Sequence, residues 1–139
     1  MSHRLHGPGL ILAALTLLLV AGCSDHGADL AGPGDGGQDD PVSYAAQIQP
    51  IFDVNCLGCH GPGGNAGLDL SPAVSYANLV GENAQASAGI RVVAGDAASS
   101  VLYLRLTGDG LGLMPPAGDL GTATTELVQR WIDEGAEEN

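Results

Sequence analysis

The segment Cys56-Leu57-Gly58-Cys59-His60 constrains this chain more than any other part of the sequence. Two thiols three positions apart lie on one helical turn, from which both can reach the vinyl groups of a single porphyrin. The imidazole of His60 then lies on the same side and can bind the iron. The motif therefore predicts a covalently attached haem of the c type, and a fold that is built around it.

The first 22 residues are typical of an export signal rather than of folded structure. Arg4 precedes the apolar run 10–20, which is shorter than the ~20 apolar residues that a comfortable membrane span needs. The run leads into Val20-Ala21-Gly22-Cys23, which resembles the lipobox of bacterial lipoproteins, in which the cysteine is lipidated and becomes the new first residue. The alternative is an ordinary signal peptide that happens to end near a cysteine. We expect residues 1–22 to be removed and Cys23 to carry a lipid.

Residues 23–41 are expected to form the lipidated cysteine and a flexible tether. They are rich in Gly and Asp and lack aromatic residues, so they have little apolar surface to bury. The folded domain is then 42–139. Ser24 does not resemble a signal for retention at the inner membrane. We therefore expect an exported, membrane-anchored lipoprotein that faces the periplasm or the cell exterior, with the outer membrane favoured.

The numbers of cysteines and charged residues narrow the range of partners. The chain has three cysteines, so lipid and haem attachment leave none for a disulfide, and a covalent cofactor can take over the stabilising role. Without the signal, three arginines and no lysine stand against 16 carboxylates, which excludes nucleic acid as a partner. The acidity favours a redox protein partner with a basic docking face, or it only keeps an exported protein soluble. We expect a monomer or a subunit of a larger complex.

The spacing of apolar residues predicts an all-α domain with long Gly- and Pro-rich loops. Pro50 suits the first turn of a short helix. Asp96 and Thr122 are expected to cap the middle and last helices, and Gly135 to end the last one. The predicted segments are a turn near 43–48, helices over about 50–58 and 97–107, a shorter helical segment over 72–80, and a last helix that starts near residue 122.

Met114 is the strongest candidate for the axial position opposite His60. It is the only methionine left when Met1 leaves with the signal, and His26 lies in the tether. The two prolines that follow have fixed dihedral angles, and the first holds Met114 in an extended conformation. The alternative is that Met114 fills a gap in the core, which is the usual role of a methionine.

The order of these motifs resembles that of a monohaem cytochrome c with the mitochondrial-type fold, and particularly the planctomycete-type cytochrome c domain. The resemblance implies that Cys56 and Cys59 bind the haem, that His60 is the proximal iron ligand, and that Met114 is the distal one. It also implies that the first and last helices cross and pack together. The segments that carry it are Tyr44–Phe52, Cys56–Pro62, Gly67–Ser71, Gly95–Asp96, Ser100–Tyr103, Met114–Pro116 and Val128–Ala136.

Two positions depart from the pattern of this family. Ala97 and Leu113 stand where the family often has a proline and an arginine, and the missing arginine bears on how the haem propionates are neutralised. Seven further residues are expected to line the haem, although each is equally compatible with a place in the plain core. They are Leu57, Leu68, Leu70, Leu79, Leu102, Leu113 and Pro115.

A haem iron with both axial positions filled has no open site for oxygen or peroxide, so the predicted function is outer-sphere transfer of one electron rather than an enzyme reaction. A haem peroxidase-like catalyst and a haem-based sensor, each with a labile distal ligand, are the alternatives. A zinc site at Cys56, Cys59 and His60 lacks an evident fourth soft ligand. A thioredoxin-like dithiol lacks the surrounding strand–helix–strand pattern.

The haem-free chain is expected to be largely unfolded. Only five residues of the chain are aromatic, so the protein core is thin, and a haem of large apolar area would supply its centre. A variant with Cys56→Ala and Cys59→Ala tests this by circular dichroism during heating. We expect no cooperative transition, and a cooperative one would contradict the prediction.

Overall fold

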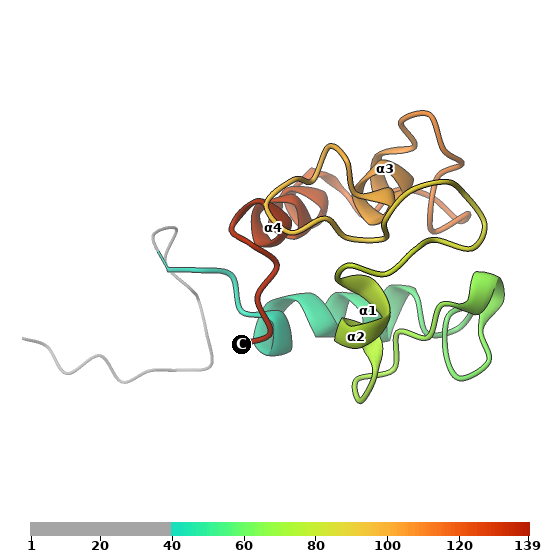
Figure 1. The fold of residues 1–139 in the computed structure, drawn as a ribbon, viewed down its shortest axis with the longest axis horizontal. Helices are drawn as coiled ribbons and strands as arrows, with labels where there is room; N and C mark the ends of the chain where they lie inside the picture. Colours follow the sequence, from blue (N-terminus) through green and yellow to red (C-terminus); the bar gives the residue numbers. More distant parts are fainter. Residues whose placement is uncertain (1–39) are drawn as a thin grey trace, which may run out of the picture. The chain divides into compact units, whose positions relative to one another are not determined.

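A computed structural model describes residues 40–139, in which helices are joined by turns and long loops (Figure 1). Within this range no strand forms, and the β-type pairings are isolated bridges such as the one between Val80 and Val92. The all-α prediction is confirmed. None of the helices in 40–139 is long and apolar enough to cross a membrane. The predicted signal peptide, the lipidation site Cys23 and the tether up to residue 39 lie outside the described residues.

The N-terminal helix begins as a single π-helical turn, η1 (Tyr44–Ile48), and continues as α1 (Gln49–Asn55). The hydroxyl of Ser43 accepts the Ala46 N–H at 3.2 Å, and the Ser43 N–H donates to the side chain of Gln47 at 2.9 Å. These bonds satisfy backbone groups at the start of the helix. Pro50 lies in the first turn of α1, as predicted. The helix ends at Asn55, earlier than the predicted residue 58, so both motif cysteines follow it.

The short α2 (Ser75–Leu79) lies within the predicted segment 72–80, whereas α3 (Val101–Thr107) begins later than predicted. Asp96 does not cap α3, because its carboxylate accepts the N–H of Ser99 at 3.0 Å within a turn. The next residue, Ala97, donates its N–H to Asp133 Oδ1 at 2.9 Å. This bond ties the turn to the last helix, so residues 97–100 do not join α3.

Thr122 is the first residue of α4 (Thr122–Asp133) and does not cap it. Gly121 precedes the helix with a φ of 80°, a conformation that glycine adopts readily, so Gly121 takes the capping position and Thr122 is already helical. The predicted end is confirmed. Gly135 has a φ of 113° and donates its N–H to the carbonyl of Ile132 at 3.0 Å.

The first and last helices pack together, as predicted. The ring of Tyr44 lies 5.2 Å from that of Trp131 and 5.3 Å from that of Tyr76, measured between centroids. Backbone N–H groups of Tyr44 and Ala45 bond to Asn139, so the end of the chain lies beside the start of η1 (Figure 1). Five apolar residues of the two helices are buried in this core: Ile48, Phe52, Val128, Trp131 and Ile132.

A buried chain of hydrogen bonds fixes α2 against the N-terminal helix. The Tyr44 hydroxyl donates to Ser75 Oγ at 2.6 Å, and Ser75 donates to Gln49 Oε1 at 2.5 Å. Gln49 Nε2 in turn donates to the carbonyl of Leu70 at 3.0 Å. Burial raises the pKa of Tyr44 to about 12, so this hydroxyl keeps its proton at neutral pH.

The packing of α4 predicts a contrast between two identical substitutions in the haem-loaded protein. Val128 is 0% exposed and Val54 is 83% exposed. Val128→Ala leaves a cavity and should lower the free energy of unfolding by about 2 kcal/mol. Val54→Ala should change it by less than about 0.5 kcal/mol. Urea unfolding measures both, and equal effects would show that α4 is not packed as described.

Candidate cofactor site

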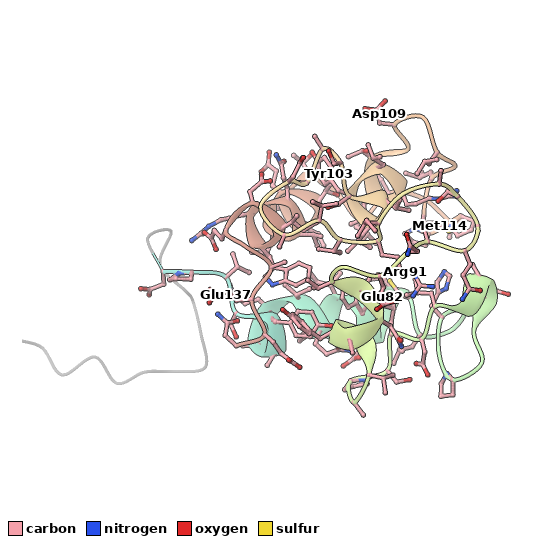
Figure 2. The ribbon with its side chains drawn as sticks, viewed as in Figure 1. Glu82, Arg91, Tyr103, Asp109, Met114 and Glu137 are labelled. Atoms are coloured by element: carbon pink, nitrogen blue, oxygen red, sulfur yellow. The ribbon has the colours of Figure 1, made fainter. Side chains whose placement is uncertain are left out.

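A cavity of about 330 Å³ lies between the segment after α1, the loops that follow it, α2, α3 and the loop before α4. Its walls are mostly apolar, and its size falls in the range of ~300–1,000 Å³ that is usual for ligand sites. Figure 2 shows two of its lining residues, Arg91 and Met114, between α3 above and α1 with α2 below. The four site residues predicted from the sequence all line this cavity: Cys56, Cys59, His60 and Met114.

The seven further residues expected to line the haem divide into two groups. Leu57 packs against the hydrophobic core and Leu113 is 37% exposed, and neither of them lines the cavity. The expectation was wrong for these two. The other five do line the cavity: Leu68, Leu70, Leu79, Leu102 and Pro115.

His60 is held in a fixed orientation on one wall. Its backbone N–H donates to the Cys56 carbonyl at 2.8 Å, which continues the turn that carries both thiols. Its ring Nδ1 lies 3.2 Å from the carbonyl oxygen of Asn65, which can only accept, so Nδ1 carries the proton in this bond. The other ring nitrogen, Nε2, is therefore the one available to a metal.

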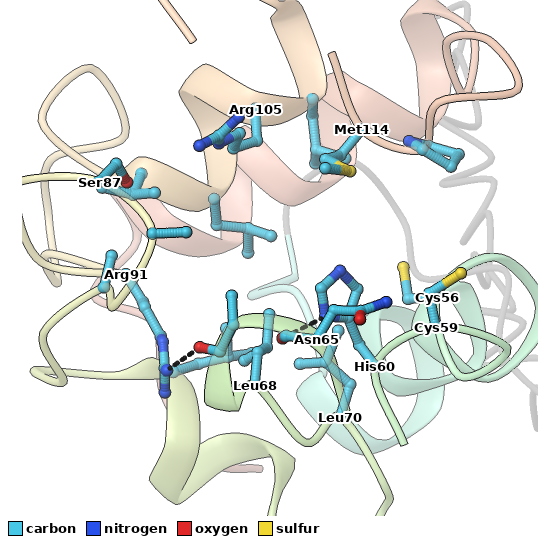
Figure 3. Close-up of a pocket in the computed structure, with 18 of the residues that line it drawn as sticks. Cys56, Cys59, His60, Asn65, Leu68, Leu70, Ser87, Arg91, Arg105 and Met114 are labelled. Atoms are coloured by element: carbon cyan, nitrogen blue, oxygen red, sulfur yellow. Dashed lines mark hydrogen bonds between the residues drawn. The ribbon is translucent and has the colours of Figure 1, made fainter. Parts of the chain in front are cut away.

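Met114 lies on the opposite wall, and its sulfur faces the His60 ring across the cavity (Figure 3). Its backbone N–H donates to the carbonyl of Arg105 in α3 at 2.8 Å. The Arg105 side chain donates to the carbonyl of Gly112 at 3.2 Å. The last turn of α3 thus holds the methionine loop through both the backbone and the side chain of Arg105.

The environment of Cys56 differs from that of a reactive thiol in a redox-active dithiol. Burial, and secondarily the charge of Cys59, raises the pKa of the Cys56 thiol to about 11. Reactive dithiols depend instead on a lowered pKa that favours the thiolate. For the zinc alternative, residues 40–139 hold no cluster of three His, Cys, Asp or Glu side chains placed to bind a metal ion.

Two arginines that the sequence analysis did not single out also line the cavity. Arg91 is buried, with 7% of its surface exposed, and Arg105 is half-buried. The sequence signal that could have found them is the scarcity of cations. Beyond residue 4 the chain has three arginines and no lysine against 16 carboxylates, and two of these three arginines line the cavity.

The residues present fit a covalently attached haem. Two thiols follow α1 along one edge of an apolar cavity, and an imidazole nitrogen and a thioether sulfur lie on facing walls. Thiols are the groups that form thioether bonds to a porphyrin, while imidazole and thioether are common axial ligands of its iron. The guanidinium groups add positive charge, which suits a porphyrin with carboxylate substituents.

Residues 56–118 match the model of a family described as planctomycete cytochrome c. This range begins at the first motif cysteine and includes His60, both arginines and Met114, and therefore most of the cavity wall. No curated protein and no solved structure matches the chain.

The close packing behind His60 predicts that Gly64 tolerates no side chain. A Cβ at Gly64 would lie 2.7 Å from the carbonyl oxygens of Gly61 and Leu68 and 2.8 Å from the His60 Cα. Gly64→Ala should therefore displace the His60 loop and lower the free energy of unfolding by about 1–3 kcal/mol. Gly58→Ala is the matched control, since a Cβ there meets no atom within 4 Å. Urea unfolding compares the two, and a Gly64 variant as stable as the control would contradict this geometry.

Proposed function

Because residues 56–118 match the model of the planctomycete cytochrome c family, we propose that this chain is an electron carrier built around one covalently bound haem. The main observation in support of the proposal is that both motif thiols, His60 and Met114 line the same cavity, with His60 and Met114 on facing walls. When bound, the haem supplies an iron that alternates between the ferric and ferrous states by gaining or losing one electron.

The chain's own residues have distinct roles in this proposal. Cys56 and Cys59 attach the porphyrin, and the covalent bonds keep it in place in both oxidation states. His60 binds the iron through Nε2, because Nδ1–H is engaged with the Asn65 carbonyl. Met114 binds from the other side, and a thioether raises the reduction potential relative to two histidines. With both sides of the iron occupied and the walls apolar, electron transfer needs little rearrangement and no acid or base.

We also propose that the carrier docks on a basic face of a redox protein and acts as a monomer or as a subunit of a larger complex. Outside the cavity, the described part of the chain has one arginine, Arg130, and it pairs with Glu134 at 2.6 Å. The surface is therefore dominated by carboxylates, which attract a basic partner and repel nucleic acid. A lipid on Cys23 would hold the domain at a membrane, with the outer membrane favoured.

Ligation by Met114 predicts a specific spectroscopic change. The haem-matured wild-type protein should show low-spin ferric iron with a sulfur-to-iron charge-transfer band and a one-electron couple. Met114→Ala should remove that band, give high-spin iron that binds cyanide readily, and lower the potential by about 100 mV or more, within the ~0.8 V span that axial ligands set.

Leu113→Ala is the control, because its side chain is the exposed neighbour of Met114 and does not line the cavity. Visible spectra during redox titration compare the three proteins. A colourless wild-type protein would refute the proposal as a whole. High-spin wild-type iron that binds cyanide or peroxide would favour a peroxidase-like catalyst, and tight ferrous binding of carbon monoxide would favour a sensor.

A further inference from the structure

Arg91 carries a buried charge that no carboxylate in residues 40–139 neutralises. Its Nη1 donates to the carbonyl of Asn78 at 2.8 Å, and its Nη2 donates to the carbonyls of Gly67 at 3.0 Å and Ala66 at 3.3 Å. The ion pair found in this range is Arg130 with Glu134, and it does not involve Arg91. Neutral carbonyls satisfy hydrogen bonds but leave the net charge in place.

An uncompensated charge with 7% exposure is expensive, since removing such an ion from water typically costs several kcal/mol. A guanidinium also has more N–H donors than these three carbonyls take up. Arg91 lines the cofactor cavity, so the compensating anion can reach it from inside that cavity. A bound anion would recover part of the desolvation penalty through charge-assisted hydrogen bonds.

The position of Arg91 identifies the anion. Figure 3 shows Arg91 and Arg105 on the side of the cavity that lies away from Cys56 and Cys59. In a haem the vinyl and propionate substituents lie at opposite edges of the porphyrin. A porphyrin attached through the two cysteines therefore directs its carboxylates toward the arginine side.

We propose that Arg91 binds a propionate carboxylate of the haem, with Arg105 as a second cation at the same end of the cavity. This inference rests on the proposed function. Arg105 is the weaker partner, because it is half-buried and one of its nitrogens is bonded to the Gly112 carbonyl. Arg91 is the stronger partner, because its charge is buried and no carboxylate in residues 40–139 neutralises it.

The same guanidinium is a positioning residue for His60. The turn η2 (Asn65–Gly67) presents three consecutive carbonyls, of which Asn65 accepts from the His60 ring and the other two accept from Arg91. Ala66 and Gly67 have φ angles of 57° and 59°, a left-handed conformation that the turn needs. One side chain thus connects the anionic end of the cavity to the turn that orients the proximal imidazole.

Removal of the charge should be measurable as a shift in the redox equilibrium. Arg91→Gln leaves a carboxylate without its cation, and the extra negative charge favours ferric iron. We expect the ferric-to-ferrous ratio at a fixed electrode potential to rise about tenfold, which is a fall of ~59 mV in the midpoint potential. Arg91→Lys keeps the charge and should recover most of the shift.

The experiment is spectroelectrochemical titration of the full-length, haem-matured proteins at one pH and ionic strength. Arg130→Gln is the matched control, because it removes the same charge from an exposed pair outside the cavity and should leave the potential unchanged. An Arg91→Gln potential equal to that of the wild type would overturn the proposal, and so would an equal shift in Arg130→Gln.

Resonance Raman spectra of the wild-type protein provide a second measurement that needs no variant. A propionate that accepts a hydrogen bond from an exchangeable N–H should change its bending frequency in D₂O. If Arg91→Gln binds no haem, an insensitive propionate band overturns the proposal and a sensitive one supports it. Wild-type protein without a one-electron couple would refute the proposed function, whereas unchanged potentials in proteins that have the couple would refute only this inference.

Discussion

The whole site depends on the packing of η1 and α1 against α4. The segment with the two thiols and the imidazole starts where α1 ends, so any movement of this helix would also move the wall of the cavity that carries His60. Tyr44, Ile48 and Phe52 hold the helix against Trp131 and its neighbours, all of them almost fully buried. A small core of large side chains is thus concentrated beside the cavity, and glycine-rich loops can complete the other walls.

An arginine fixes the loop on each of two facing walls of the cavity. On the wall that carries His60, Arg91 bonds to the turn whose first carbonyl orients the His60 ring. On the wall that carries Met114, the backbone of Arg105 bonds to Met114 and its side chain bonds to Gly112. Loops without regular structure can place a side chain accurately only when other groups fix their backbone, and here long side chains from neighbouring segments bond to the loop carbonyls.

The sequence was sufficient for the helical class, for the contact between the terminal helices and for four residues that meet at the cavity, because apolar spacing and the motif are local signals. These four are Cys56, Cys59, His60 and Met114. It was not sufficient for the caps at Asp96 and Thr122, where a bond to Asp133 and the conformation of Gly121 decide the helix starts. Leu57 and Leu113 were misassigned because the direction of a loop side chain depends on tertiary packing. Arg91 was missed because its partners are backbone carbonyls, which leave no pattern in the sequence, so the scarcity of cations was the signal that pointed to it.

The contacts at the two ends of the described segment determine where a preceding segment joins the domain. Arg130 bonds to the carbonyl of Asp40, and Asn139 bonds to the start of η1, so both ends of the described segment meet at one pole. Figure 2 shows Glu137 toward this pole and Met114 with Arg91 toward the other. A segment that precedes residue 40 therefore joins the domain at the pole opposite Met114 and Arg91, which both line the cavity.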